Sequence, residues 1–261
     1  MHPNPVLPFA PAPSSFTVFF PAWNEEDLIV RAVSAGGDLC ERLQAAGEIG
    51  DYEILVVDDA STDGTGKLAD ELAEENPAVR VVHHDVNRKL GGALKTGFAE
   101  ARGDLVLYTD ADLPFDMRDV EKALRLLRLY EADIVSPYRL DRTAEGPRRT
   151  VYSFAYNHLV RWAFGLRLRD VNFAFKLIRR RVLDNVTLES EGSFIDVELL
   201  ANAQRLGFGI IQFGVDYFPR TRGVSTLSSV AVIRKMLLEM RRLAPEIRRI
   251  EPLPASVLEA R

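Results

Sequence analysis

The sequence contains one cysteine, Cys40, and no long uninterrupted hydrophobic run. A single cysteine cannot close an internal disulfide or build a cysteine-only metal cluster, and such low usage suits a reducing compartment. No apolar run reaches the roughly 18 residues of a membrane-spanning helix, and the first residues lack a signal-peptide pattern. The phosphate-binding motifs G-x-G-x-x-G and G-x-x-x-x-G-K-[ST] are also missing. These gaps disfavour a disulfide-rich secreted domain, a membrane-spanning protein, a dinucleotide oxidoreductase and a P-loop enzyme.

Charge is distributed unevenly along the 261 residues, although the net charge is only −5. Residues 1–130 hold 12 basic and 23 acidic side chains, whereas residues 131–261 hold 21 and 15. We interpret the acidic half as a place for a cation and the basic half as facing an anion, with chance clustering on solvated faces as the alternative. Because the net charge is acidic and no recognition module is present, we expect no nucleic-acid partner.

Hydrophobic runs alternate with amphipathic segments through the first half of the chain. This alternation predicts an α/β fold with a mostly parallel sheet, covered by helices on both faces. Asn24 is predicted to cap the first helix, and Pro21 to end the first strand. We expect strands at 16–20, 52–57, 79–83, 105–109 and 133–136, and helices at 25–46, 65–75, 91–101 and 117–130.

The pattern changes after Arg139, where a polar loop precedes a basic, aromatic segment at 152–169. Further along, we expect short strands at 174–178 and 210–213, a helix at 195–206, and a basic amphipathic helix at 229–249. We therefore predict a flexible N-terminal tail over residues 1–15, one domain over 16–228, and a C-terminal amphipathic helix and tail over 229–261. Chains of this length bury enough surface to fold as one large domain.

Three of the four early predicted strands end in polar segments that contain acidic residues. The first strand leads into Pro21-Ala-Trp-Asn-Glu-Glu26, the second into Asp58-Asp-Ala-Ser-Thr-Asp-Gly-Thr65, and the fourth into Asp110-Ala-Asp112. Ligands of open parallel sheets bind outside the carboxyl ends of the strands, so these acids are expected at one edge. Asp110 and Asp112 would repel each other unless a hard divalent cation neutralised them, and its open positions would suit diphosphate oxygens.

The second of these motifs has two other interpretations. Asp59 to Asp70 fits a calcium-loop template loosely, but that template needs a helix where residues 54–57 predict a strand. Asp63-Gly64-Thr65 is also typical of a turn and helix cap. Neither interpretation accounts for two acids at the strand exit.

These motifs, with Asn87 to Gly97 between the second and the last, resemble family 2 glycosyltransferases of the GT-A fold. The chain is most similar to the dolichol- or polyprenyl-phosphate mannose and glucose synthases, over residues 16–228. The resemblance implies a Rossmann-like sheet with a C-terminal helical elaboration. It also implies transfer of a hexose, with inversion, from a nucleotide diphosphate sugar of the GDP-mannose or UDP-glucose type to a polyprenyl or dolichyl phosphate.

The resemblance also assigns a donor site. It implies that Asp110 and Asp112 bind Mg²⁺ or Mn²⁺ on the donor diphosphate and act in catalysis as the leaving group develops charge. Pro114 stands where the family often has a glutamine ligand, which leaves the remaining coordination to water or Asp116. The implied nucleotide-sugar-binding residues are Pro21, Trp23, Glu25, Asp58, Asp59, Lys95, Asp110, Ala111 and Asp112.

Basic residues of the second half supply an acceptor site by the same resemblance. Arg139, Arg149, Ser153 and Arg220 are implied to bind the acceptor phosphate, with Arg139 also acting in catalysis, although single arginines at a surface often form ion pairs instead. The family's closing Ser-Lys is Ser225-Thr226 here, so one expected cation is missing.

Two pairs of residues keep more than one interpretation. Asp170 and Asn172 would either face the sugar or belong to ordinary strand packing. Asp196 and Glu198 would either serve as a base for a soluble acceptor or place charge at a helix start, whereas a phosphate acceptor strictly requires no base.

We therefore predict an inverting, metal-dependent glycosyltransferase with a lipid-phosphate acceptor, in the cytoplasm or peripherally at the inner face of the membrane. The basic amphipathic segments would suit a lipid interface, the protein core or a second subunit of a homo-oligomer equally well. The alternatives are a transferase with a soluble acceptor and a nucleotide-sugar-binding protein without turnover.

Overall fold

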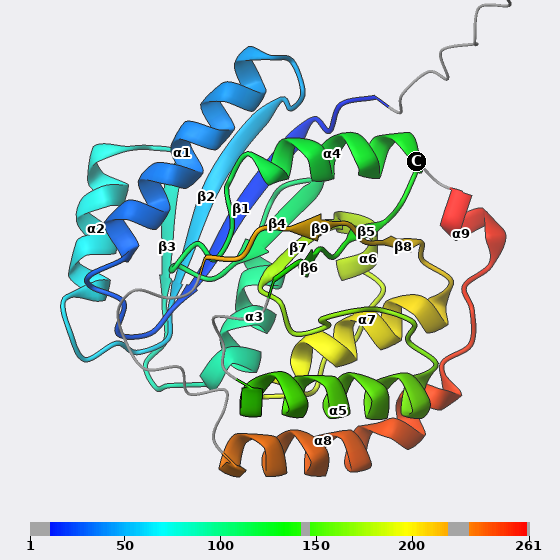
Figure 1. Ribbon diagram of the computed structural model, residues 1–261. Helices are drawn as coiled ribbons and strands as arrows, with labels where there is room; N and C mark the ends of the chain where they lie inside the picture. Colours follow the sequence, from blue (N-terminus) through cyan, green and yellow to red (C-terminus); the bar gives the residue numbers. More distant parts are fainter. Residues whose placement is uncertain (1–10, 142–146, 219–229, 260–261) are drawn as a thin grey trace, which may run out of the picture.

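A seven-stranded sheet with helices on both faces forms the centre of the computed structural model, which describes residues 11–141, 147–218 and 230–259 (Figure 1). Within the described residues, no helix combines the length and the apolar character that crossing a bilayer requires. The strands are β1 (Ser15–Ala22), β2 (Asp51–Asp58), β3 (Val79–His83), β4 (Leu105–Thr109), β5 (Ile134–Val135), β6 (Tyr138–Arg139), β7 (Phe175–Arg179), β8 (Ile210–Ile211) and β9 (Gly214–Val215).

The helices include a short one, α6, and a C-terminal one, α9, that the sequence pattern did not predict. They are α1 (Ile29–Ala45), α2 (Thr65–Glu75), α3 (Lys89–Glu100), α4 (Asp119–Leu129), α5 (Pro147–Phe164), α6 (Arg180–Leu183), α7 (Ile195–Leu206), α8 (Val230–Arg249) and α9 (Ala255–Glu259).

The strand order β3-β2-β1-β4-β7-β5-β8 confirms the predicted mostly parallel sheet, with β7 antiparallel to both of its neighbours. Two further strands, β6 and β9, pair separately and in parallel. The segment after Arg139 therefore does more than elaborate the domain at its C-terminal end, because β7 and β8 belong to the central sheet. β7 lies between β4 and β5, which leaves β5 attached to the sheet through a strand that comes some 40 residues later in the chain.

The core has two layers, one on each face of the sheet (Figure 1). Along β1, Phe16, Val18 and Phe20 are buried with α1, α2 and α4, whereas Phe19 is buried on the other face with α3 and α7. This alternation follows from the two-residue period of a strand. The predicted amphipathic helix at 229–249 is α8, and its residues Leu243, Ala244 and Ile247 belong to the second layer.

The first strand and helix differ from prediction around Asn24. β1 continues through Pro21 to Ala22, because beyond Phe19 it pairs with β2 alone and a proline is tolerated at such an edge. Asn24 adopts a left-handed conformation, with φ of 55°, and does not cap the helix. α1 begins only at Ile29, after a turn in which the Glu25 carbonyl accepts hydrogen bonds from Leu28 and Ile29.

The helix α3 approaches β1 closely at Gly97. A Cβ atom there would lie 2.0 Å from the Phe19 ring, which also packs against Phe98 and Tyr108. We expect Gly97→Ala to lower the free energy of unfolding by about 1–3 kcal/mol, because overpacking outweighs the gain in helix propensity. Gly37→Ala in α1 is the matched control: its nearest contact would be ordinary, at 3.7 Å from Ile54, so stability should rise by about 0.5–1 kcal/mol. Urea unfolding of both variants measures the difference, and equal stabilisation would contradict this account of the α3–β1 contact.

Candidate active site

The loops that follow β1 and β2 are joined by hydrogen bonds at the carboxyl edge of the sheet. The Asn24 amide oxygen accepts from the Thr62 N–H at 2.8 Å, and the Asn24 N–H donates to the Ser61 hydroxyl at 3.0 Å. One residue further, the Glu25 N–H donates to the Thr65 hydroxyl at 2.8 Å. Two segments about 40 residues apart in sequence thus form one unit, which carries Trp23, Glu25 and Asp59 of the predicted donor-binding residues.

A second set of contacts joins the same two loops through carboxylates. The Gly64 N–H donates to the Glu26 carboxylate at 2.7 Å, and the Glu26 N–H donates to the Asp63 carboxylate at 3.3 Å. Within the second loop, the Asp63 carboxylate also accepts from the Thr65 N–H at 3.0 Å. Burial by itself would raise the pKa of Asp63, but its hydrogen bonds with Thr65 and the Glu26 N–H together hold that pKa below its usual range. The predicted turn and cap function of residues 63–65 therefore exists alongside the strand-end acids.

Asp58 and Asp59 at the end of β2 are both buried and engaged by histidines. The two Asp58 oxygens contact the Ser61 N–H at 3.1 Å and His83 Nδ1 at 2.9 Å. Asp59 Oδ1 contacts His84 Nδ1 at 2.6 Å. The structure therefore places these acids next to Ala22 at the end of β1 and directs their carboxylates into a hydrogen-bonded network.

Asp110 and Asp112 follow β4 in a tight turn with the buried Ala111 between them. The Leu113 N–H donates to the Asp110 carbonyl at 3.2 Å, and Leu113 adopts a φ of 48°. Both carboxylates lie close enough to Tyr108 to affect it: burial raises the pKa of the Tyr108 phenol, and the charges of Asp196, Asp110 and Asp112 raise it further. Both acids therefore lie at the carboxyl end of β4, near Tyr108.

The chemistry of this pair suits a hard divalent cation. Carboxylate oxygens are the ligands that Mg²⁺ and Mn²⁺ prefer, and Mg²⁺ usually keeps positions for water and substrate phosphate. Among the described residues, no group of three or more His, Cys, Asp or Glu side chains forms a complete metal site. Asp110 and Asp112 would hold such a cation only together with donor oxygens or water. Asp116, the other acid considered, accepts a hydrogen bond from the Arg118 N–H at 2.9 Å, just before α4.

The predicted donor contact Lys95 lies farther along the edge. Its Nζ donates to the Glu189 carbonyl at 3.5 Å, so the side chain is directed to the loop that precedes α7. Pro21 is part of β1, and half of the Trp23 side chain is exposed beyond the strand. The described contact of the Lys95 side chain is therefore with this loop and not with the loops after β1 and β2.

Arg139 forms a bidentate ion pair with Asp170. Its Nε and one terminal nitrogen each donate to a different Asp170 oxygen at 2.6 Å, and the two side chains are only 10% and 4% exposed. The guanidinium group also lies over the rings of Phe173 and Tyr217. The sequence allows Asp170 either a contact with the sugar or a place in ordinary strand packing. In the structure, Asp170 is instead the buried ion-pair partner of Arg139.

The side chains of the other predicted acceptor residues lie outside the described structure. Arg149 and Ser153 belong to α5, in a part whose side chains lie outside the described structure, and Arg220 lies outside the described residues altogether. Their predicted role therefore stays a prediction.

A buried ion pair joins β7 to the start of α7. Lys176 on β7 is fully buried directly opposite Tyr108 on β4, and its Nζ lies 2.7 Å from Asp196 Oδ1 in the first turn of α7. Burial raises the pKa of Asp196, and the Lys176 ammonium group opposes that rise. Sequence reasoning missed Lys176, although a charge within the alternating run Phe173-Ala-Phe-Lys is the signal that marks it.

Glu198, two residues further in the same first turn of α7, makes different contacts. Its two carboxylate oxygens accept hydrogen bonds at 2.8 Å from the backbone N–H groups of Glu189 and Ser190. Burial raises the pKa of Glu198, and these two N–H groups partly counter the rise. Asp196 and Glu198, the two acids at the start of α7, therefore both bind partners inside the protein.

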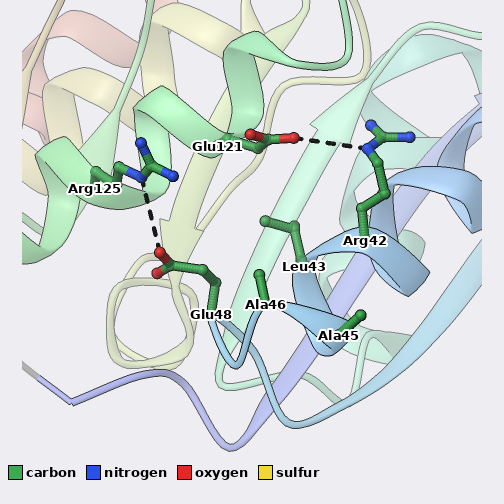
Figure 2. A pocket seen from close by; sticks show the side chains of 7 residues that line it. All are labelled: Arg42, Leu43, Ala45, Ala46, Glu48, Glu121 and Arg125. Carbon is green, nitrogen blue, oxygen red and sulfur yellow. Dashed lines mark ion pairs between the residues drawn. The ribbon is translucent and has the colours of Figure 1, made fainter.

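A cavity of about 490 Å³ lies elsewhere, between the end of α1 and α4 (Figure 2). Two ion pairs cross it: Arg42 to Glu121 and Arg125 to Glu48, each at 3.7 Å. None of the predicted site residues lines it. The arrangement of charges around this cavity is self-compensating, and it is separate from the strand-end acids.

Comparison with known proteins identifies the family. The model of glycosyl transferase family 2 matches residues 17–187, well over half of the chain. Polyprenol monophosphomannose synthase of Mycolicibacterium smegmatis is 33% identical over 224 residues, which cover 81% of this chain and 80% of that protein. Glycosyltransferase AglD of Haloferax volcanii is 37% identical over 209 residues, covering 78% of this chain, so the chain spans only about a third (33%) of that protein's length.

Solved structures agree on the fold. The mannosyltransferase PcManGT of Pyrobaculum calidifontis, in complex with GDP-Man and Mn²⁺, superposes with a TM-score of 0.61 at 22% identity, covering 98% of this chain and 72% of that one. Glucosyl-3-phosphoglycerate synthase of Mycobacterium tuberculosis, with Mn²⁺, UDP-glucose and phosphoglyceric acid, gives 0.63 at 22% identity, covering 87% and 80%. The fold is therefore that of GT-A glycosyltransferases. The chain belongs to glycosyltransferase family 2.

The buried pair at the start of α7 yields a stability prediction. Asp196→Asn should leave Lys176 as an uncompensated buried charge and cost about 3–5 kcal/mol of unfolding free energy. The double variant Lys176→Met with Asp196→Leu should regain most of this loss, because apolar residues of similar size replace a buried pair without large cost. Thermal and urea unfolding of the three proteins measure the effect. If Asp196→Asn were as stable as the wild type yet inactive in sugar transfer, Asp196 would be a catalytic base and this assignment would be wrong.

Proposed function

We propose that this glycosyltransferase moves a hexose from a GDP- or UDP-sugar to a polyprenyl or dolichyl phosphate. The observation that carries the proposal is the Asp110-Ala-Asp112 turn at the end of the central strand β4, next to the joined loops of β1 and β2. Two relatives that match most of this chain, from Mycolicibacterium smegmatis and Micrococcus luteus, bear the names polyprenol monophosphomannose synthase and undecaprenyl-phosphate mannosyltransferase. Their names support a lipid-phosphate acceptor.

In the proposed donor site, Trp23, Glu25, Asp58 and Asp59 line the nucleoside pocket. Asp110 and Asp112 hold Mg²⁺ or Mn²⁺, which, when bound, stabilises the negative charge that develops on the departing diphosphate. Two solved neighbours with Mn²⁺ and a nucleotide sugar support this choice of cofactor. Pro21, Ala111 and Lys95 complete the proposed set, with Lys95 at its outer margin.

The two acids at the start of α7, Asp196 and Glu198, are held in buried contacts, and this favours a phosphate acceptor over a hydroxyl acceptor. A sugar or alcohol hydroxyl must lose a proton as it attacks, and this requires a positioned base. Asp196 is paired with Lys176, and Glu198 with two backbone N–H groups, so each would have to leave a buried contact to act as one. A phosphate monoester is already anionic near neutral pH and attacks without that step.

The proposed reaction is a single displacement at the anomeric carbon. A phosphate oxygen of the acceptor forms the new C–O bond while the bond from that carbon to the donor diphosphate breaks, so GDP or UDP leaves and the configuration inverts. We propose that Arg149, Ser153 and Arg220 bind the acceptor phosphate, joined by Arg139 when the phosphate competes with Asp170 for its guanidinium group.

The transfer itself tests this proposal. With Mn²⁺ or Mg²⁺ and a panel of GDP- and UDP-sugars, we expect sugar transfer to a short polyprenyl phosphate, measured by mass spectrometry of the product. Asp112→Asn should reduce the rate at least 100-fold, because it removes a charge that holds the cation. Asp184→Asn, an exposed aspartate after α6 at the opposite edge of the sheet, is the matched control and should retain the wild-type rate. Transfer only to soluble phosphates such as phosphoglycerate, or donor binding without transfer, would contradict the lipid acceptor.

We further propose that α5 and α8 form a membrane-docking surface. The two helices pack against each other as an outer layer (Figure 1), and Trp162 and Leu238 are 82% and 58% exposed on them. Several cations, Arg161, Arg234, Arg241 and Arg242, are also exposed there. Exposed aromatic and apolar side chains among arginines suit an interface with anionic headgroups.

Sedimentation with vesicles measures this docking. We expect binding to vesicles that contain phosphatidylglycerol and at least a tenfold weaker affinity for phosphatidylcholine alone, since each basic side chain adds attraction to an anionic surface. Arg241→Glu with Arg242→Glu should reduce the binding about tenfold or more. Arg31→Glu with Arg118→Glu, exposed on the opposite helical layer, changes the net charge equally and should bind like the wild type. Equal loss in both double variants would show that net charge alone, not this surface, governs the association.

A further inference from the structure

Two adjacent histidines at the end of β3 face two adjacent aspartates at the end of β2. In the parallel register of these strands, Asp58 lies opposite His83. His83 Nδ1 is 2.9 Å from Asp58 Oδ2, and His83 Nε2 is 2.9 Å from Asp70 Oδ1 on α2. The neighbouring His84 lies 2.6 Å from Asp59 through Nδ1 and 2.8 Å from the Thr96 hydroxyl through Nε2.

The partners of each ring determine how many protons it must carry. An ionised carboxylate only accepts hydrogen bonds, so a ring that contacts two carboxylates needs an N–H on both nitrogens. His83, between Asp58 and Asp70, therefore fits its surroundings as an imidazolium cation. His84 contacts one carboxylate and one hydroxyl, and a hydroxyl can donate. Its partners are satisfied by a singly protonated ring with the proton on Nδ1.

The Asp58 carboxylate that His83 holds is also the anchor of the loop that follows β2. Its other oxygen accepts from the Ser61 N–H, and the Ser61 hydroxyl in turn accepts from the Asn24 N–H in the loop after β1. Gly66 packs directly against the contact between Asp58 and His83. A Cβ atom at position 66 would lie 2.8 Å from Asp58 Oδ2 and 3.4 Å from His83 Cε1. A continuous series of hydrogen bonds thus runs from His83 to the segment that carries Trp23 and Glu25.

We propose that His83, in its doubly protonated form, is a positioning residue for the nucleotide pocket. It fixes Asp58, and through Asp58 it fixes the two loops that would contact the nucleoside. This inference rests on the proposed donor site, since it concerns the affinity of that site for a nucleotide. His83 does not touch the proposed metal ligands Asp110 and Asp112, so its effect is on donor affinity and not on the leaving group.

The proposal gives donor binding a defined pH dependence. Two charged groups contact His83, namely Asp58 from β2 and Asp70 from α2. The hydrogen bond to Asp70, followed by that to Asp58, raises the pKa of His83 above its ordinary value, although partial burial opposes the rise. Below that raised pKa the cation bridges both carboxylates. As the pH rises through it, the ring loses one N–H and one of the two contacts, so the nucleotide pocket loosens on the alkaline side of the ordinary histidine pKa of about 6.5.

Binding of GDP and UDP, each with Mn²⁺, measured calorimetrically between pH 5.5 and 9, tests the proposal. We expect the wild-type affinity to decrease several-fold as the pH rises through the His83 pKa. His83→Gln carries its donors on a single nitrogen, so it cannot reproduce the two N–H groups on separate ring nitrogens, and it does not titrate; it should bind about tenfold more weakly at low pH and lose this pH dependence. Asp70→Asn keeps an acceptor but removes a negative charge, so the same decrease should occur at lower pH. His158→Gln, an exposed histidine on α5, is the matched control and should reproduce the wild-type profile.

Nuclear magnetic resonance of the imidazole nitrogens provides a readout that does not require a ligand. At pH 6.5 it should show both His83 nitrogens protonated. A neutral His83, or a His83→Gln variant with the wild-type affinity and pH profile, would overturn the positioning role while leaving the donor site in place. Failure of the wild type to bind either nucleotide at any pH would instead overturn the proposed function, and this role with it.

Discussion

The parallel register of β2, β1 and β4 concentrates negative charge at one edge of the sheet, and much of the surrounding structure compensates for it. Like charges that are held close together in a partly buried place are costly unless each has a counter-charge or hydrogen-bond donors. Asp58 contacts His83, and Asp59 contacts His84. Nearby, Asp170 forms an ion pair with Arg139, and Asp196 forms one with Lys176. For Asp110 and Asp112 we propose a divalent cation that arrives with the donor. The chemistry of the site thus depends on where the fold has placed the basic side chains that pair with the other acids.

The regular elements of the first half could be predicted almost to the residue, because each is encoded locally. Thr65–Glu75, Val79–His83 and Leu105–Thr109 match their predicted bounds, since turn residues flank them and their hydrophobic period is clear. The start of α1 could not be predicted in this way. Asn24 is a good capping residue in isolation, but its side chain accepts a hydrogen bond from Thr62, 38 residues away, in a loop that the local sequence does not reveal.

The candidate site shows the same division between local and distant information. Aspartates that directly follow hydrophobic strands are visible in sequence, and the structure does bring Asp58, Asp59, Asp110 and Asp112 to one edge. The partners of these aspartates could not be predicted from the sequence. Which acid a histidine at the end of β3 or a lysine on β7 contacts depends on the order of the strands in the sheet. Lys176 meets Asp196 because β7 enters the sheet beside β4 in the antiparallel sense, and no pattern within residues 170–200 specifies that neighbour.

The position of β7 also constrains how the chain assembles. Although β5 directly follows α4 in sequence, its hydrogen-bonding partners are β7 and β8, so it has nothing to join until more than 40 further residues have been synthesised. Until then β4 presents an unpaired edge, which is the kind of surface through which incomplete sheets associate. Because long-range pairings form slowly, the half of the molecule that carries the acidic motifs must wait, exposed, for the other half to close the sheet. A fragment that ends after β5 would contain every strand-end aspartate of the candidate donor site and yet have no means of finishing its own core.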